Sequence, residues 1–185
     1  MKKFIYILGL FFCLALLQLV KPISTIIRYE TILNNGKQFR FKTQPVDPYD
    51  AFRGRYVALG VEENKTPLPE GLKLRHFQKV YALIKEDDKG FAKIAGLSIE
   101  RPVGDDYIQV RVSYCSRNEA NLILPFNRYY MEETLAPAAE RAYRGHNVRG
   151  NQDAYITVRV KSGDAVVEEL YIAGKPILEF LKEQK

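Results

Sequence analysis

The sequence predicts a mainly β domain that follows one N-terminal transmembrane helix, and three observations support this prediction. Residues 4–20 form an apolar run without a charge. Beyond it, short segments of alternating apolar and polar residues recur between turns that contain glycine or proline. The chain holds 12 Tyr and 10 Phe, and aromatic residues are enriched in strands. We therefore expect an antiparallel barrel or sandwich-like fold of about eight strands, with one or two short soluble helices.

The N-terminal segment begins with Lys2 and Lys3 and continues as an apolar run in which Gln18 is the strongly polar exception. As a helix this run would measure about 25 Å, whereas the hydrocarbon core of a bilayer is about 30 Å thick. Local thinning of the bilayer, or extension of the helix through residues 22–27, would close the gap. Because lysines favour the cytoplasmic side of a membrane helix, we expect the N-terminus inside and the rest of the chain outside.

Several interpretations of this segment compete. A cleaved signal peptide would end in small residues, but residues 17–22 read Leu-Gln-Leu-Val-Lys-Pro. A lipoprotein signal would place small residues before its cysteine, but two phenylalanines precede Cys13. A buried helix of a soluble protein is the remaining alternative to an uncleaved anchor. The uncleaved anchor fits best, with residues 1–27 as anchor and juxtamembrane segment and residues 28–185 as an exported, β-rich domain.

The first strands follow a turn signal at residues 34–36. Residues 38–43 alternate, with two phenylalanines on one side and basic residues on the other. Residues 56–62 have apolar side chains at alternate positions, which predicts one shared face. Residues 80–84 form an apolar run that is typical of a strand.

The later elements include two hairpins and one helix. A charged tip at residues 86–90 predicts that residues 91–97 return along the preceding strand. A proline in the first turn and the following Gly145 predict a helix over residues 137–143. Short connections between consecutive strands favour antiparallel pairing. Further strands are expected at residues 107–114, 122–126, 154–160 and 165–172, of which the last two form the second hairpin.

The charge of the chain does not indicate a nucleic-acid partner. There are 28 Lys and Arg against 22 Asp and Glu, which gives a net charge of +6. Because Lys2, Lys3 and Lys21 flank the apolar run, the remainder holds 25 basic against 22 acidic residues, without a basic stripe. Cys13 lies in the apolar run and Cys115 lies beyond it, so we expect no disulfide between them.

Three segments together resemble a known family. They are residues 45–59, residues 124–133 with Leu-Pro-Phe and Tyr-Tyr-Met-Glu-Glu, and residues 170–176, Leu-Tyr-Ile-Ala-Gly-Lys-Pro. In their order along most of the chain after the anchor, they are similar to the bacterial GDYXXLXY family. That family is named for the signature Gly-Asp-Tyr-x-x-Leu-x-Tyr.

The signature is altered in this chain. Gly54, Tyr56 and Leu59 agree with it, whereas Arg55 replaces the aspartate and Val61 replaces the final tyrosine. Any role that requires the aspartate is therefore not carried over by the resemblance.

The resemblance implies a bacterial membrane-associated protein and supplies no reaction, because the function of the family is unknown. Family members tend to be encoded beside multi-spanning membrane proteins, which implies an integral membrane partner. Together with the flanking lysines, this predicts a single-pass protein of the bacterial inner (cytoplasmic) membrane with residues 4–20 in the lipid bilayer. Its N-terminus would be inside and its domain on the periplasmic side.

A charged cluster beside a rigid, proline-containing turn is the first candidate binding site. It consists of Asp47, Asp50, Arg53 and Arg55, and its arginines could bind an acidic partner. The alternative is a capped turn whose charges are solvated. Tyr56 begins the next strand on the face opposite the apolar positions, where its hydroxyl could hydrogen-bond or its ring could pack.

A basic segment around the predicted helix is the second candidate site. Arg141, Arg144 and Arg149 could meet lipid phosphate or an acidic patch, and the alternative is a solvated loop. Cys115 and His146 are a conceivable nucleophile and base, but chance supplies such a pair easily.

No catalytic, cofactor-binding or metal-binding motif is present in the sequence, so we expect no cofactor and no metal site. The favoured function is a non-catalytic interaction domain that works with an integral membrane partner. Two alternatives stay open. One is an envelope hydrolase or lipid-modifying enzyme built from scattered Asp, Glu and Tyr, and the other is a binding module for an acidic envelope ligand.

Overall fold

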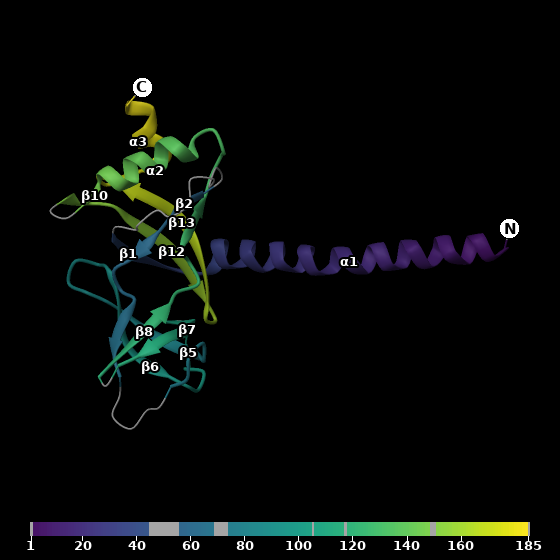
Figure 1. Ribbon diagram of the computed structural model, residues 1–185, viewed down its shortest axis with the longest axis horizontal. Coiled ribbons are helices and arrows are strands. Elements are labelled where there is room, and N and C mark those ends of the chain that lie inside the picture. The colour runs from purple at the N-terminus through teal and green to yellow at the C-terminus, as the bar shows by residue number, and fades with distance from the viewer. Residues whose placement is uncertain are drawn as a thin grey trace.

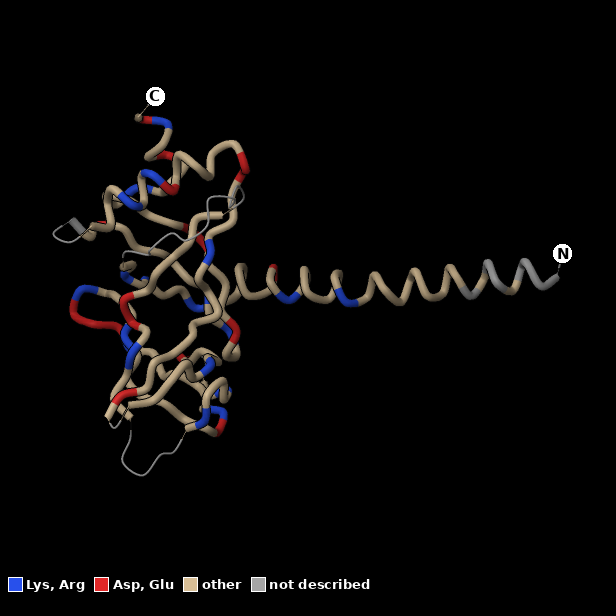
Figure 2. Tube along the Cα trace, viewed as in Figure 1, with Lys and Arg blue, Asp and Glu red and all other residues tan. Residues whose placement is uncertain are grey.

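A long N-terminal helix, α1 (Lys2–Asn35), projects from a β-rich body (Figure 1). Its 34 residues give a helix about 51 Å long. By length and composition, its residues Phe11–Asn35 could cross a membrane, and their most apolar stretch is not buried in the protein. The charged residues marked on α1 lie in the half nearer the body (Figure 2). The computed structural model describes residues 2–44, 56–68, 74–104, 106–116, 118–148 and 151–184.

Helix α1 continues well beyond the apolar run. Pro22 lies inside it, although proline lacks the N–H that a helix interior uses. The hydroxyls of Ser24 and Thr25 donate to the carbonyl oxygen of Lys21 at 2.8 and 2.9 Å, so these polar groups are satisfied within the helix. The predicted division after residue 27 therefore falls within one continuous helix. We call its part from Lys21 to Asn35 the stem.

Two five-stranded sheets form most of the body. All pairs between named strands are antiparallel, which confirms the predicted mainly β fold. The first sheet has the order β14 (Lys175–Pro176), β13 (Asp164–Ile172), β12 (Tyr155–Lys161), β1 (Lys37–Gln44) and β3 (Gly60–Val61). The second sheet has the order β4 (Lys65–Pro67), β8 (Glu119–Ile123), β7 (Tyr107–Cys115), β5 (Lys79–Glu86) and β6 (Ala92–Ser98).

Shorter elements complete the body. Helix α2 (Ala136–Gly145) and helix α3 (Ile177–Glu183) lie together at the end of the body that carries the C-terminus (Figure 1). They match the expectation of one or two short soluble helices. The remaining pairs are β2 (Tyr56–Ala58) with β9 (Arg128–Tyr130), and β10 (Asn147–Val148) with β11 (Asn151–Gln152).

One hydrophobic core draws on both sheets. Phe39 and Phe41 of β1 belong to the same buried cluster as Val80 of β5 and Val110 of β7. The ring of Phe41 packs 5.0 Å from the ring of Phe126. The alternation that predicted β1 is therefore the alternation that buries its phenylalanines, as the period of a strand requires.

The strand predicted over residues 56–62 is divided between two sheets. Residues 56–58 form β2 and pair with β9, whereas residues 60–61 form β3 and pair with β1. Between them the backbone N–H of Leu59 donates to the carbonyl oxygen of Asn127 at 3.0 Å. Val57, Leu59 and Val61 are all buried, so the predicted shared face is preserved through the change of partner.

Candidate functional site

A groove lies at the base of the stem. It comprises two adjoining pockets of about 340 and 520 Å³, which share Tyr29, Pro125 and Ala165. We call the two together the stem groove. The smaller pocket is also lined by Lys79, Gln109, Val110, Arg111, Leu124 and Asp164, and the larger one by Arg128, Tyr129, Tyr130, Val167 and Glu168.

Two acidic side chains line the stem groove among the described residues, and both are engaged by arginines from outside the groove. Asp164 accepts a hydrogen bond from Arg28 Nε at 2.8 Å. Glu168 accepts two from Arg159, at 2.8 and 2.9 Å, and one from Gln38 at 2.6 Å. Burial alone would raise the pKa of the Glu168 carboxyl, but these hydrogen bonds outweigh burial and lower it. Among the described lining residues, the acidic charges of the groove are therefore compensated by arginines.

The basic side chains of the stem groove come from three strands. Lys79 of β5 and Arg111 of β7 are direct cross-strand partners and line the smaller pocket. Arg128 of β9 lines the larger pocket. None of the three forms an ion pair with a carboxylate among the described residues.

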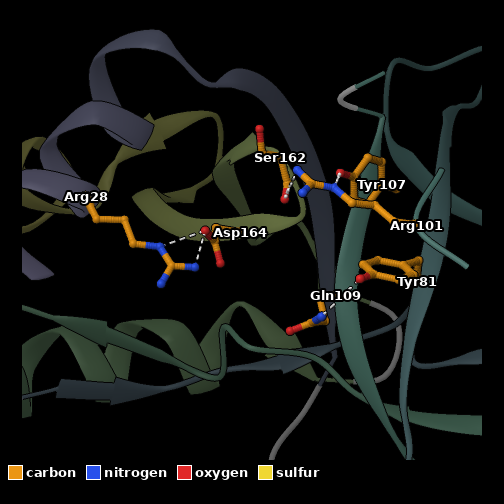
Figure 3. A network of polar contacts seen from close by, with 7 residues as sticks. All are labelled: Arg28, Tyr81, Arg101, Tyr107, Gln109, Ser162 and Asp164. Atoms are coloured by element: carbon orange, nitrogen blue, oxygen red, sulfur yellow. Dashed lines mark hydrogen bonds and ion pairs between the residues drawn. The ribbon is translucent and has the colours of Figure 1, made fainter. Parts of the chain in front are cut away.

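A polar network joins the stem to both sheets beside the groove (Figure 3). Arg28 of the stem binds Asp164 at the start of β13. Gly163, in the adjacent hairpin turn, accepts a hydrogen bond from the backbone N–H of Gln109 at 2.8 Å. Arg101 donates to the hydroxyl of Tyr107 at 2.7 Å, and Figure 3 shows it between Tyr107 and the hairpin. The hairpin between β12 and β13 therefore fixes the stem against the second sheet.

An aromatic cluster with a cation lies at the larger pocket. Tyr56 is paired with Tyr130 across β2 and β9, and their ring centroids are 5.6 Å apart. The Arg128 guanidinium lies 4.8 Å from the centre of the Tyr56 ring, which is a cation–π distance. Because Arg128 and Tyr130 line the larger pocket, Tyr56 supports one wall of the groove.

This cluster brings together two of the segments that carry the family resemblance, because β2 belongs to the first segment and β9 to the second. The model of the family described as GDYXXLXY protein matches residues 18–170. The chain belongs to the GDYXXLXY family. No curated protein and no solved structure matches the chain.

The signature of this GDYXXLXY protein divides into core and groove positions. Leu59 and Val61 are buried in the core, whereas Tyr56 is half-buried beside the groove. Val61, which stands where the signature has its last tyrosine, pairs with the buried Thr43 of β1. Within the described part of the signature, the ring of Tyr56 therefore contacts Arg128 and Tyr130, which line the larger pocket.

The predicted site residues do not all fall within the described chain. Arg144 pairs with Glu140 one turn earlier on α2, at 2.5 Å. Arg141 lines a separate pocket with His146 and Leu181. These arginines therefore line neither pocket of the stem groove. The other predicted residues lie outside the described residues: Asp47, Asp50, Arg53, Arg55 and Arg149.

The nucleophile and base pair is not assembled. Nδ1 of His146 lies 3.0 Å from Asp153 Oδ1, and its ring lies edge-on to Phe180 at 5.1 Å. Cys115 is the last residue of β7, in the second sheet. Within the described ranges, no group of three or more His, Cys, Asp and Glu is placed to hold a metal ion.

The stem groove was not predicted from the sequence. Arg111 was visible only as a member of the polar face of a strand, and Lys79 precedes the apolar run at residues 80–84. Lys79 and Arg111 are brought together by the pairing of β5 with β7, although they are 32 positions apart in the sequence. Tyr29 reaches the same place because the helix continues through Pro22.

Substituting Tyr129 with phenylalanine tests the wall of the groove. The half-buried Tyr129 donates to Glu169 at 2.7 Å, and burial, followed by this carboxylate, raises the pKa of its phenol. The contribution of the protonated Tyr129 phenol to the free energy of unfolding is fully present below pH 10, where the phenol of the unfolded chain is also protonated. This contribution is lost as the pH rises through the pKa of the folded state. We expect Tyr129→Phe to cost about 1 kcal/mol at pH 8 and to flatten the loss of stability above pH 10.

Urea unfolding of the detergent-solubilised chain at pH 8 and pH 10.5 measures both effects. Tyr130→Phe is the matched control, because Tyr130 is the adjacent tyrosine and is exposed. An equal change in both variants would contradict the assignment to the Tyr129–Glu169 contact.

Proposed function

We propose that this GDYXXLXY protein is a membrane-tethered, non-catalytic interaction domain that works with an integral membrane partner. In this proposal α1 is an uncleaved anchor in the bacterial inner membrane, and the β-rich body lies on the periplasmic side. Residues 4–27 give about 36 Å of helix, which crosses a hydrocarbon core about 30 Å thick when the helix is tilted, and the long side chain of Lys21 can reach the membrane interface. The lysines before this span support an N-terminus in the cytoplasm.

The observation that carries the proposal is an apolar face of the stem that the body does not cover. Ile23, Ile26 and Ile27 are 51%, 60% and 61% exposed. At 100° per residue, they lie within about 60° of Ile23 on the helix surface. Ile32, which is 3% exposed, lies about 180° from Ile23 and packs into the body. The spacing of the exposed isoleucines suits a second apolar helix, so we assign this face to a transmembrane helix of the partner.

Two carboxyl groups of the body are poorly suited to general acid catalysis. A general acid or base working near neutral pH needs a carboxyl pKa raised toward 7. The pKa values of the Asp87 and Glu168 carboxyl groups are both lowered from their ordinary values. The main cause for Asp87 is the backbone N–H of Phe91, which donates a hydrogen bond to the carboxylate and lowers its pKa, as in a capped hairpin turn. Neither group suits the acid of a hydrolase.

Site-specific photo-crosslinking in native membranes tests the proposed function. A photo-reactive amino acid at position 26 is expected to form an adduct with a multi-spanning membrane protein identified by mass spectrometry. The matched control is position 25, because the exposed Thr25 lies about 160° around the stem from Ile23 and Ile27 and about 100° from Ile26. Adducts with lipid alone at position 26, or equal adducts from both positions, would overturn the proposal.

A further inference from the structure

We propose that the smaller pocket of the stem groove binds the phosphate headgroup of an anionic phospholipid. The lipid belongs to the leaflet from which the stem emerges, and Lys79 and Arg111 are its cationic contacts. This inference rests on the anchoring of α1 in a membrane, which is part of the proposed function. It adds a ligand class and a site to that function.

The first argument is the pairing of like charges. Lys79 and Arg111 stand directly opposite each other on β5 and β7. Like charges in that position destabilise a sheet unless an anion compensates them. A second cross-strand pair, Lys85 and Lys93, has such compensation, because Glu63 lies 3.7 Å from Lys93. Lys79 and Arg111 have no carboxylate partner among the described residues. A phosphate placed between them would compensate their positive charges.

The second argument is the composition of the pocket. Its acidic residue, Asp164, is held by Arg28 and does not oppose an anion as a free carboxylate would. Ile123, which pairs with Arg111 across β7 and β8 and is 39% exposed, supplies apolar surface beside the two cations. A cationic pair next to apolar surface matches a molecule that carries a phosphate on a hydrocarbon body.

The third argument is the distance of the pocket from the membrane. Tyr29 lies eight residues beyond Lys21, which is about 12 Å along the helix. Over that interval Ile23 and Ile27 extend the apolar surface of the stem. The headgroup region occupies about 5–7 Å beyond each face of the hydrocarbon core. With these isoleucines at the hydrocarbon boundary, Tyr29 lies among the headgroups, where tyrosine is enriched in membrane proteins.

The test uses the full chain reconstituted in nanodiscs of equal amounts of phosphatidylglycerol and phosphatidylcholine. After gentle detergent extraction, mass spectrometry measures the ratio of the two lipids that stay bound. Lys79→Gln and Arg111→Gln are each expected to lower the preference for phosphatidylglycerol about fivefold, and together about thirtyfold. Thermal unfolding of each variant confirms that the body remains folded.

The matched control is the double variant Lys85→Gln and Lys93→Gln. It removes the same charge from a cross-strand pair that lies outside the stem groove, with Lys85 about 20 Å along β5 from Lys79. This variant is expected to keep the lipid preference of the unaltered chain. An equal loss in both double variants would show diffuse attraction and overturn the site, as would no loss in either.

Two further arms separate the alternatives. Inorganic phosphate is expected to leave the bound phosphatidylglycerol in place, and displacement of the lipid by phosphate at similar concentration would overturn a lipid site. Alkaline extraction of vesicles tests the anchor itself. Release of the chain would overturn the anchor and with it the proposed function, whereas retention with an unchanged lipid preference in the groove variant would overturn only the lipid site.

Discussion

Replacing Gly163 with alanine is expected to lower the free energy of unfolding by about 2–5 kcal/mol. Gly163 has a φ of +90°, a backbone conformation that alanine adopts only with strain. A Cβ at this position would also lie 2.8 Å from Cε2 of Tyr107, one of the largest fully buried side chains. Relief of that clash would move the hairpin turn away from β7 and weaken the hydrogen bond from Gln109 to Gly163.

Gly104 provides the matched control for this substitution. Its φ is +98°, but a Cβ there would meet no described atom within 4 Å. Gly104→Ala should therefore cost only the strain of the backbone, about 1–2 kcal/mol. Urea unfolding of the full chain in detergent micelles, followed by tyrosine fluorescence, measures both variants. Equal losses would show that close packing against Tyr107 contributes nothing.

Replacing Gly36 with alanine is expected to cost about 1–3 kcal/mol and to change the angle between the stem and the body. Gly36 follows the last residue of α1, and its N–H donates to the carbonyl oxygen of Ile32 at 2.7 Å. A Cβ would lie 2.5 Å from that oxygen and 3.1 Å from the carbonyl oxygen of Val160. Both atoms belong to the backbone, so no side-chain rotation relieves the clash and the helix end must move.

Thermal unfolding measures the loss of stability, and pulsed electron paramagnetic resonance measures the angle. Spin labels at positions 25 and 93, in a background without Cys13 and Cys115, should report a shifted distance in Gly36→Ala. Gly145→Ala is the control, because Gly145 lies in α2 with open space around its Cα. It should lose no stability and leave the distance unchanged. An unshifted distance in Gly36→Ala would contradict the assignment of Gly36 as the close contact at the stem end.

The local pattern of the sequence was sufficient for most of the fold. Strict alternation predicted β1 and β7, and charged turns predicted the hairpins of β5 with β6 and β12 with β13. Tyr107 departs from its pattern: it shares the polar face of β7 with Arg111 but is 1% exposed. The reason is tertiary, since the hairpin turn at Gly163 covers its ring and Arg101 satisfies its hydroxyl.

Other features could not be predicted because they depend on distant partners. Lys21 and Pro22 suggested the end of the apolar segment, whereas the helix continues to Asn35 and docks Ile32 and Arg28 on the body. The candidate site differs for the same reason. The predicted binding sites were chosen for their many charged residues, at residues 47–55 and 141–149. The stem groove instead forms where α1, both sheets and β9 meet.

Because the stem is one continuous helix, the number of residues between the membrane and the body determines how the body is oriented. A flexible linker would let the body turn freely, but each residue of a helix advances it by about 1.5 Å and rotates it by about 100°. Gly36 and the Arg28–Asp164 contact then fix the body to the helix end. A rotation of α1 about its axis, or a translation along that axis, would therefore move the body and the stem groove with it.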